Sequence, residues 1–190
     1  TEVLVLEMGM RGLGQIAELC AISSPNIGII TNIGTTHLEL LGSWENIAKA
    51  KWELIESLPA GGTAILNTED YFSMKMAMTL SINKVFYGLV GKYAQPDLSA
   101  SSIRPEGINS TSFMVTVDRE SCPVRLPLPG EHNVLDALAA LAAGYVCGVR
   151  LEDGARALEN FQLSKMRLEF WQGLYGSTLI NDVYNANPVS

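Results

Sequence analysis

The chain has 190 residues and is 47% hydrophobic, which is enough for one moderate domain, or for one domain and part of another. Its net charge of −7 and its 13 scattered basic residues argue against a nucleic-acid partner, which needs clustered lysine and arginine. No apolar run is long enough to span a membrane and no basic-then-apolar leader is seen, so neither a membrane segment nor a signal peptide is expected.

The first half of the chain alternates β-rich runs with helical patterns, each run bounded by Gly, Pro, Asn or Asp. This order predicts an α/β fold with a mostly parallel sheet, right-handed crossovers and helices on both faces. The expected strands are 3–7, 27–31, 63–66 and 84–87, and the expected helices are 15–22, 44–58 and 71–80.

The pattern of apolar and polar residues changes after about residue 97. Short alternating runs between 98 and 128 predict a small antiparallel sheet. Helices are expected at 133–146 and 152–160, followed by strands at 168–171 and 178–182. The last segment reads as the opening of a further domain. The chain also begins inside a strand-like run, so we expect it to be part of something longer.

The cysteines are odd in number and far apart, at Cys20, Cys122 and Cys147. That spacing is typical of neither a disulfide framework nor a zinc site. Two of them, Cys20 and Cys147, lie in apolar helical stretches, where we expect buried free thiols. The pattern favours a reducing, cytoplasmic compartment.

Lys51 lies on the apolar face of the expected helix 44–58. It follows Ile47 by four residues and precedes Ile55 by four, so it points from the middle of an apolar stripe. A half-buried lysine loses hydration energy and is usually paired, neutralised or modified, although its long stem also allows the ammonium group to reach the surface. Both readings stay open: a lysine that reaches solvent, or an amine held against a metal or a phosphate.

Glu7 and His37 each follow an apolar run that is expected to be a strand. The carboxyl ends of parallel strands face the ligand crevice, and a carboxylate there is suited to magnesium. The alternatives are that Glu7 caps the next helix and that His37 is merely structural. The expected shared edge favours a joint role for the two side chains.

The segment from Gly130 opens a helix on which Asn133 and Asp136 are neighbours off the apolar face. Such side chains can bind an adenine edge or a ribose hydroxyl, although plain capping explains them equally. The closing run 181–188 is rich in Asn and Asp, which suits either a turn or a phosphate contact. No Gly-x-x-x-x-Gly-Lys-Ser/Thr phosphate loop occurs in the chain.

Taken together, five motifs in this order resemble the Mur ligase family of peptidoglycan synthesis. The resemblance covers essentially the whole chain, and the ordered set is far more specific than any single motif. The motifs are Glu7-Met8-Gly9, Thr31-Asn32…His37-Leu38-Glu39, Ala48-Lys49-Ala50-Lys51, Gly130-x-His132-Asn133 and Tyr184-Asn185-Ala186-Asn187-Pro188.

The resemblance implies a central ATP-binding domain over residues 1–164, whose phosphate loop would precede Thr1, and the start of a C-terminal ligase domain over 165–190. It implies that ATP phosphorylates a substrate carboxylate and that an amine then displaces the phosphate to form an amide. The closing motif is most like that of members that add D-alanyl-D-alanine to a UDP-N-acetylmuramoyl-tripeptide, here acting as a monomer. A folylpolyglutamate synthase relative and a non-catalytic fragment are the alternatives.

The resemblance also implies roles for individual residues. Glu7 and His37 would bind Mg²⁺, and Lys51 would react with CO2 to give a carbamate that serves as a further magnesium ligand. Around ATP, the family's pattern matches Asn133, Asp136, Arg167, Asp182, Tyr184 and Asn185. Asp136 departs from that pattern, since the family usually has Asn there, and its contact is therefore left open.

Overall fold

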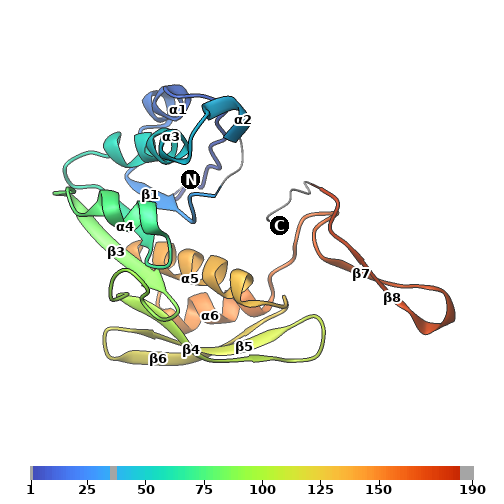
Figure 1. Cartoon of the computed structure of the whole chain (residues 1–190). Coiled ribbons are helices and arrows are strands. Elements are labelled where there is room, and N and C mark those ends of the chain that lie inside the picture. The colour runs from blue at the N-terminus through green and yellow to red at the C-terminus, as the bar shows by residue number, and fades with distance from the viewer. Residues whose placement is uncertain (1, 35–37, 185–190) are drawn as a thin grey trace. The chain divides into compact units, whose positions relative to one another are not determined.

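The computed structural model describes residues 2–34 and 38–184 and divides into two compact units, Thr1–Pro96 and Asp97–Ser190 (Figure 1). Each unit combines strands with helices. The first unit contains α1 (Gln15–Ser23), β1 (Ile27–Ile30), α2 (Leu38–Leu41), α3 (Trp44–Glu56), β2 (Thr63–Asn67), α4 (Tyr71–Ala77) and β3 (Asn83–Gly88).

The strands of the first unit form a parallel sheet in the order β1-β2-β3. Ile27 is paired with Thr63, and Thr63 is in turn paired with Asn83. Parallel neighbours need a crossover between them, and α3 and α4 supply the two crossovers. Along the central strand β2, residues 64–67 are all buried, as is typical of a parallel strand covered on both sides.

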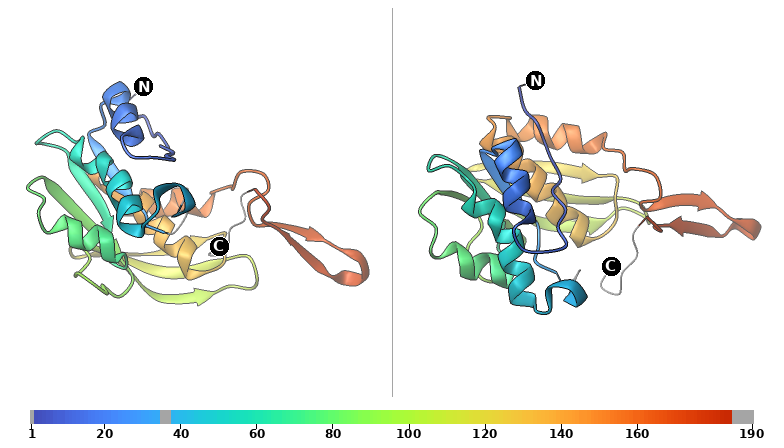
Figure 2. Two further views of the ribbon diagram at one scale, coloured as in Figure 1. Left: turned by 45° about the horizontal axis from the view of Figure 1, so that its top comes forward. Right: turned by 90° about the horizontal axis from the view of Figure 1, so that it is seen from above.

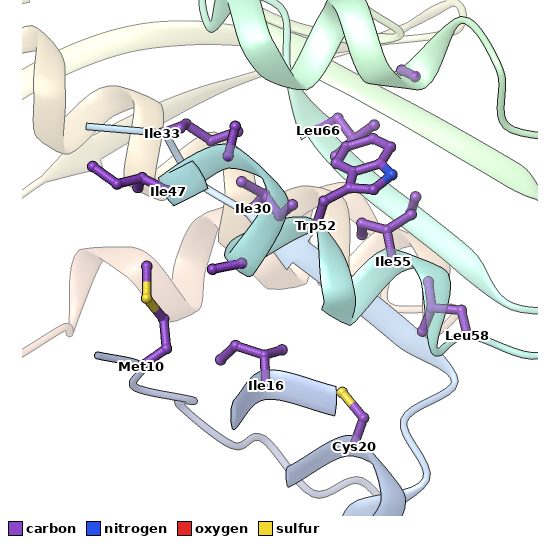
Figure 3. Close-up of a cluster of buried hydrophobic side chains, with 14 of the residues drawn as sticks. Met10, Ile16, Cys20, Ile30, Ile33, Ile47, Trp52, Ile55, Leu58 and Leu66 are labelled. Carbon is purple, nitrogen blue, oxygen red and sulfur yellow. The ribbon is translucent and has the colours of Figure 1, made fainter. Parts of the chain in front are cut away.

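Helix α3 is the centre of the first unit. It begins after Ser43, whose hydroxyl accepts a hydrogen bond from Asn46 N at 3.1 Å, an N-cap that satisfies one of the unpaired amides of the first turn. The helix packs closely on β1 at Gly28, where an added Cβ would lie 3.1 Å from Ile55 Cδ1. Figure 3 shows the core between α1, α3 and the strands, including Ile16 and Cys20 of α1 and Trp52 of α3.

In the second unit, an antiparallel sheet carries two helices that run side by side (Figure 2). Its middle strand is paired on both edges, and every second residue of that strand is buried, the period expected of a sheet with one covered face. Helix α5 contacts β4, and α6 contacts β6. The elements are β4 (Leu98–Pro105), β5 (Thr111–Val117), β6 (Glu120–Leu126), α5 (Glu131–Val146) and α6 (Leu151–Glu159).

The second unit ends in a two-stranded antiparallel hairpin, β7 (Glu169–Gln172) and β8 (Thr178–Asn181). A short 3₁₀ turn, Leu174–Gly176, connects the strands. The turn forces Tyr175 into the left-handed region at φ 57°, a conformation that a bulky residue seldom adopts.

The α/β class, the parallel order of the first unit, the antiparallel sheet at 98–128 and the two final strands are confirmed, with element ends within a few residues of those expected. The antiparallel pairing of the two final strands was not predicted. The expected strand 3–7 is wrong: residues 3–7 have no regular secondary structure and are exposed. A strand needs a neighbour to pair with, and residues 3–7 have no ladder partner within the described chain. The one-turn helix α2 was not foreseen, because four residues carry too little periodicity.

The structure confirms one of the two expected buried cysteines. Cys20 is buried, as expected, but Cys147 is exposed, because it is the C-cap of α5 rather than part of the packed face. The expected domain boundary near residue 165 stays a prediction. Among the described residues, no helix is both long and apolar enough to cross a membrane.

Candidate functional site

The four residues that follow β1, 31–34, have no regular secondary structure, yet their backbone is held by side chains from neighbouring elements. We call residues 31–34 the β1 loop. The carbonyl oxygen of Thr31 accepts a hydrogen bond from Asn67 Nδ2 at 2.9 Å and another from Tyr87 Oη at 3.3 Å. The start of the loop is therefore fixed by the ends of β2 and β3.

Ile33 is bonded on both sides of its backbone. Its N–H donates to Asp70 Oδ2 at 2.8 Å, and its carbonyl oxygen accepts from Trp44 Nε1 at 2.7 Å. Its side chain is 2% exposed, in the core of the first unit. Asp70 is the N-cap of α4, and its other oxygen accepts a hydrogen bond from Ser73 N at 2.7 Å.

Lys51 reaches the same loop from α3, where its Nζ donates to the carbonyl oxygen of Asn32 at 2.7 Å. The residue is half-buried, and Ile47 and Ile55, one turn to either side, are fully buried. Burial lowers the pKa of Lys51, and the negative charge of Asp70 opposes that shift. The apolar-face position expected from the helical pattern is thus confirmed, and the amine of Lys51 is bonded to the β1 loop.

Glu7 is exposed in the structure, and the reason for placing it at a strand end has been overturned with the strand itself. No hydrogen bond or ion pair within the described residues joins Glu7 to Lys51. The turn that follows Glu7 is nevertheless tied to α3. Glu53 Oε1 accepts from Gly14 N at 2.6 Å and Glu53 Oε2 from Ala17 N at 3.2 Å, so this side chain caps the N-terminus of α1 from a distance.

His37 and Asn185 lie outside the described residues, and their expected roles stay predictions. The β1 loop leads in the sequence to His37, which follows Ile33 by four positions.

In the second unit, Asn133 is buried in the first turn of α5, contrary to its expected place off the apolar face. Its Nδ2 donates to the carbonyl oxygen of Pro129 at 2.7 Å and lies 3.1 Å from His132 Nε2. Asp136 is exposed as a residue, yet partial enclosure of its carboxyl group raises its pKa, and His132 opposes the shift. The pair combines a fixed amide with a carboxylate whose charged form is disfavoured.

The hairpin brings together two of the residues that the sequence singled out far apart. Arg167 precedes β7 and Tyr184 follows β8, and the guanidinium carbon of Arg167 lies 4.5 Å from the centre of the Tyr184 ring. The amide of Tyr184 also donates to Met166 O at 3.2 Å. Asp182 is exposed between them in sequence. Such cation–π stacking favours an orientation of the guanidinium group over the ring.

The side chains around Lys51 are compatible with a magnesium site. Oxygen ligands are what Mg²⁺ prefers, and a carbamate on Lys51 would add two oxygens close to the carboxylate of Asp70. Among residues 2–34 and 38–184, no group of three or more His, Cys, Asp or Glu side chains is placed to hold a metal.

Sequence reasoning missed Asp70, Trp44 and Glu53. Asp70 carried a weak signal, since an acidic residue directly before a helical pattern is a candidate N-cap. Nothing in the sequence indicates its second bond to Ile33, because the two residues stand 37 positions apart. Glu53 gave no signal either, since its partners lie 36 and 39 positions upstream.

The fold and the site define a domain of the Mur ligase type. The family model for the Mur ligase middle domain matches residues 1–144, and the chain therefore belongs to the Mur ligase family. It is similar to the UDP-N-acetylmuramoyl-tripeptide–D-alanyl-D-alanine ligase of Bacillus subtilis, with 36% identity over 100% of the chain and 40% of that protein. The corresponding ligase of Escherichia coli is 32% identical over 96% of the chain and 40% of its own length.

A solved structure of a relative has the same fold. The crystal structure of MurF from Acinetobacter baumannii superposes with a TM-score of 0.88 and 36% identity, covering 97% of this chain and 40% of that one. The chain thus spans about 40% of the length of the relatives it matches.

Proposed function

We propose that this chain is part of an ATP-dependent ligase that adds D-alanyl-D-alanine to a UDP-N-acetylmuramoyl-tripeptide in peptidoglycan synthesis. Relatives named for that reaction in Bacillus subtilis and Escherichia coli match 100% and 96% of the chain. The L-alanine ligase of Desulforamulus reducens matches 83%, which favours the dipeptide-adding reaction. The ligase is a cytoplasmic monomer in this proposal.

The observation that carries the proposal is the state of Lys51. Lys51 is half-buried on an apolar helix face, its amine hydrogen-bonds to the carbonyl oxygen of Asn32, and burial lowers its pKa. A lowered pKa increases the neutral fraction of the amine, which is the nucleophilic form. Reaction of that amine with CO2 gives a carbamate and releases one proton.

The proposed reaction has two steps. The γ-phosphoryl group of ATP passes to the terminal carboxylate of the tripeptide, giving ADP and an acyl phosphate. The amine of D-alanyl-D-alanine then attacks the acyl carbon, phosphate leaves, and the amide forms. Mg²⁺ held by Glu7, His37 and carbamylated Lys51 would neutralise phosphate charge during transfer, which supplies much of the catalysis in phosphoryl transfer.

The nucleotide contacts are assigned to the second unit in the same proposal. Asn133 and Asp136 would face the adenine and ribose, with Asp182, Tyr184 and Asn185 beside the nucleotide. Arg167 would pair with the phosphates, and its stacking on Tyr184 supports this because it orients a guanidinium group for bidentate recognition.

The test is turnover in the ligase that carries this chain, followed by phosphate release and mass detection of the amide product. Lys51→Ala is expected to lower kcat by about 100-fold, the upper range for losing support at a metal site, with partial rescue by added formate or acetate. Lys49→Ala is the matched control, since Lys49 is exposed on the same helix. Full activity of Lys51→Ala would refute the carbamate role, and absence of amide product with the unaltered ligase would refute the function.

The non-catalytic alternative concerns the 190-residue chain by itself, and ATP hydrolysis by that chain is the relevant measurement. Its sequence contains no Gly-x-x-x-x-Gly-Lys-Ser/Thr loop, so these residues alone are expected to show no magnesium-dependent ATP hydrolysis. Hydrolysis above a Lys51→Ala background would contradict that expectation.

A further inference from the structure

The β1 loop is held more tightly than its lack of secondary structure suggests. Loop backbone is ordinarily satisfied by water at the surface. Here three successive residues are bonded by side chains instead: Thr31 by Asn67 and Tyr87, Asn32 by Lys51, and Ile33 by Trp44 and Asp70, at distances between 2.7 and 3.3 Å.

We propose that Asp70 and Trp44 are positioning residues for the ligase site, an inference that rests on the function proposed above. They clamp the N–H and the carbonyl oxygen of Ile33, so the β1 loop has one defined course after β1. Because Asn32 O is the hydrogen-bond partner of Lys51 Nζ, the same clamp also fixes where that amine can lie. Groups that orient metal ligands from behind in this way typically affect activity 10- to 100-fold.

The two hydrogen bonds of the Asp70 carboxylate allow its positioning role at Ile33 to be separated from its structural role as the N-cap of α4. One carboxylate oxygen caps α4 through Ser73 N, and the other accepts from Ile33 N. Serine is as good an N-cap as aspartate, but its single hydroxyl is too short to serve both amides. Asp70→Ser therefore retains the cap and removes the clamp.

A substitution at Trp44 removes the hydrogen bond to the carbonyl oxygen of Ile33 independently of Asp70. The Trp44 indole N–H donates to Ile33 O, and its ring packs against Phe72 with centroids 5.4 Å apart. Trp44→Phe removes the donor and leaves an aromatic ring in place. The two variants remove the hydrogen bonds of the Ile33 N–H and of the Ile33 carbonyl oxygen, so their effects should combine less than additively if they break one clamp.

The first arm measures amide hydrogen exchange by NMR in the 190-residue chain. Asp70→Ser is expected to lower protection at Ile33 at least tenfold while protection at Ser73 and the melting temperature stay near those of the unaltered chain. Unchanged protection at Ile33 would overturn the proposal, because the clamp would then not exist. This arm does not depend on ligase activity, so it is independent of the proposed function.

The second arm measures kinetics in the ligase that carries the chain. Asp70→Ser and Trp44→Phe are each expected to lower kcat about 10-fold or more, raise the magnesium concentration needed for half-maximal rate, and leave the KM for D-alanyl-D-alanine within about twofold. Leu58→Ala is the control: it removes a buried side chain just beyond the C-terminal end of α3 and should lower the melting temperature without a change in magnesium requirement. Loss of Ile33 protection with unaltered kcat and magnesium requirement would overturn the proposal.

Discussion

Lys51 in the first unit and Asp136 in the second are ionisable side chains whose charged forms are disfavoured by their surroundings. Burial lowers the pKa of Lys51 and raises the pKa of Asp136. Both were candidates from the sequence, and perturbed groups of this kind concentrate at functional sites. The shared cause, partial loss of hydration, means that each residue reduces stability at neutral pH relative to a neutral side chain of similar shape.

Asp136→Asn is expected to raise the melting temperature of the chain at neutral pH. The pKa of Asp136 is higher in the folded than in the unfolded state, where it is near 3.8. The folded state therefore binds protons more tightly, and the stability that this provides is present below 3.8 and is lost as the pH rises through the folded pKa. The gain from Asn should accordingly be full at neutral pH and disappear on acidification.

The measurement is a series of thermal melts between neutral pH and pH values below 3.8, with Glu120→Gln, an exposed carboxylate on β6, as the control. A gain from Asp136→Asn that persisted undiminished in acid would rule out the enclosed carboxylate as its cause.

Residue-scale prediction succeeded where a local pattern decides the outcome. Lys51 is half-buried because a helix places residues four apart on one face, which the sequence alone reveals. Asn133 was misplaced because its amide is drawn to Pro129 O, a bond that depends on how the preceding turn folds back. The clamp by Asp70 on Ile33 lay beyond sequence reasoning, since its partners meet only in the folded first unit.

At the scale of elements, α1 depends on α3 for its start. Gly14, at the N-cap position, has a φ of 85° and no side chain that could accept a hydrogen bond. The first backbone amides of α1 therefore have no side-chain cap from the N-cap residue. Glu53 supplies the cap from α3, accepting from Gly14 N and Ala17 N. A carboxylate at a helix N-terminus is also favoured by the helix dipole. The turn after Glu7 is thus anchored by the helix that carries Lys51.

Glu53→Ala is expected to destabilise the first unit by about 1–2 kcal/mol, the usual effect of losing a helix cap with charge-assisted hydrogen bonds. Amide exchange at Gly14 and Ala17 should rise together, because both lose the same acceptor. Glu56→Ala is the matched control on the same helix, where the side chain is exposed. Equal stability of the two variants in urea denaturation would show that the distant cap contributes nothing.

The helices were predictable because their apolar periodicity is internal to each segment, as in 44–58, which the structure gives as α3, Trp44–Glu56. The prediction of a strand at 3–7 was wrong because strand formation depends on residues outside the segment. Its apolar composition was read correctly, but a strand exists only through its neighbours, and Val3 to Leu6 are instead between 51% and 86% exposed.

At the scale of the whole molecule, two of the described segments that combine several exposed apolar side chains are residues 3–6 and the β7–β8 hairpin. In the hairpin, Leu174 is 81% exposed and Tyr175 is fully exposed. Large apolar patches on soluble proteins usually mark surfaces that contact something else. The hairpin makes few packing contacts, so its side chains should influence surface behaviour far more than folding stability.

Tyr175→Asn tests this separation. The substitution removes an exposed ring and places at φ 57° a residue that tolerates the left-handed region, so the melting temperature should stay constant or rise slightly. Binding of a hydrophobic dye to the 190-residue chain should fall, as should its tendency to associate at high concentration. Leu138→Asn is the opposite control, because Leu138 is fully buried in α5 and its loss should lower the melting temperature sharply. A drop in melting temperature with Tyr175→Asn comparable to that control would mean that the hairpin is part of the folding core.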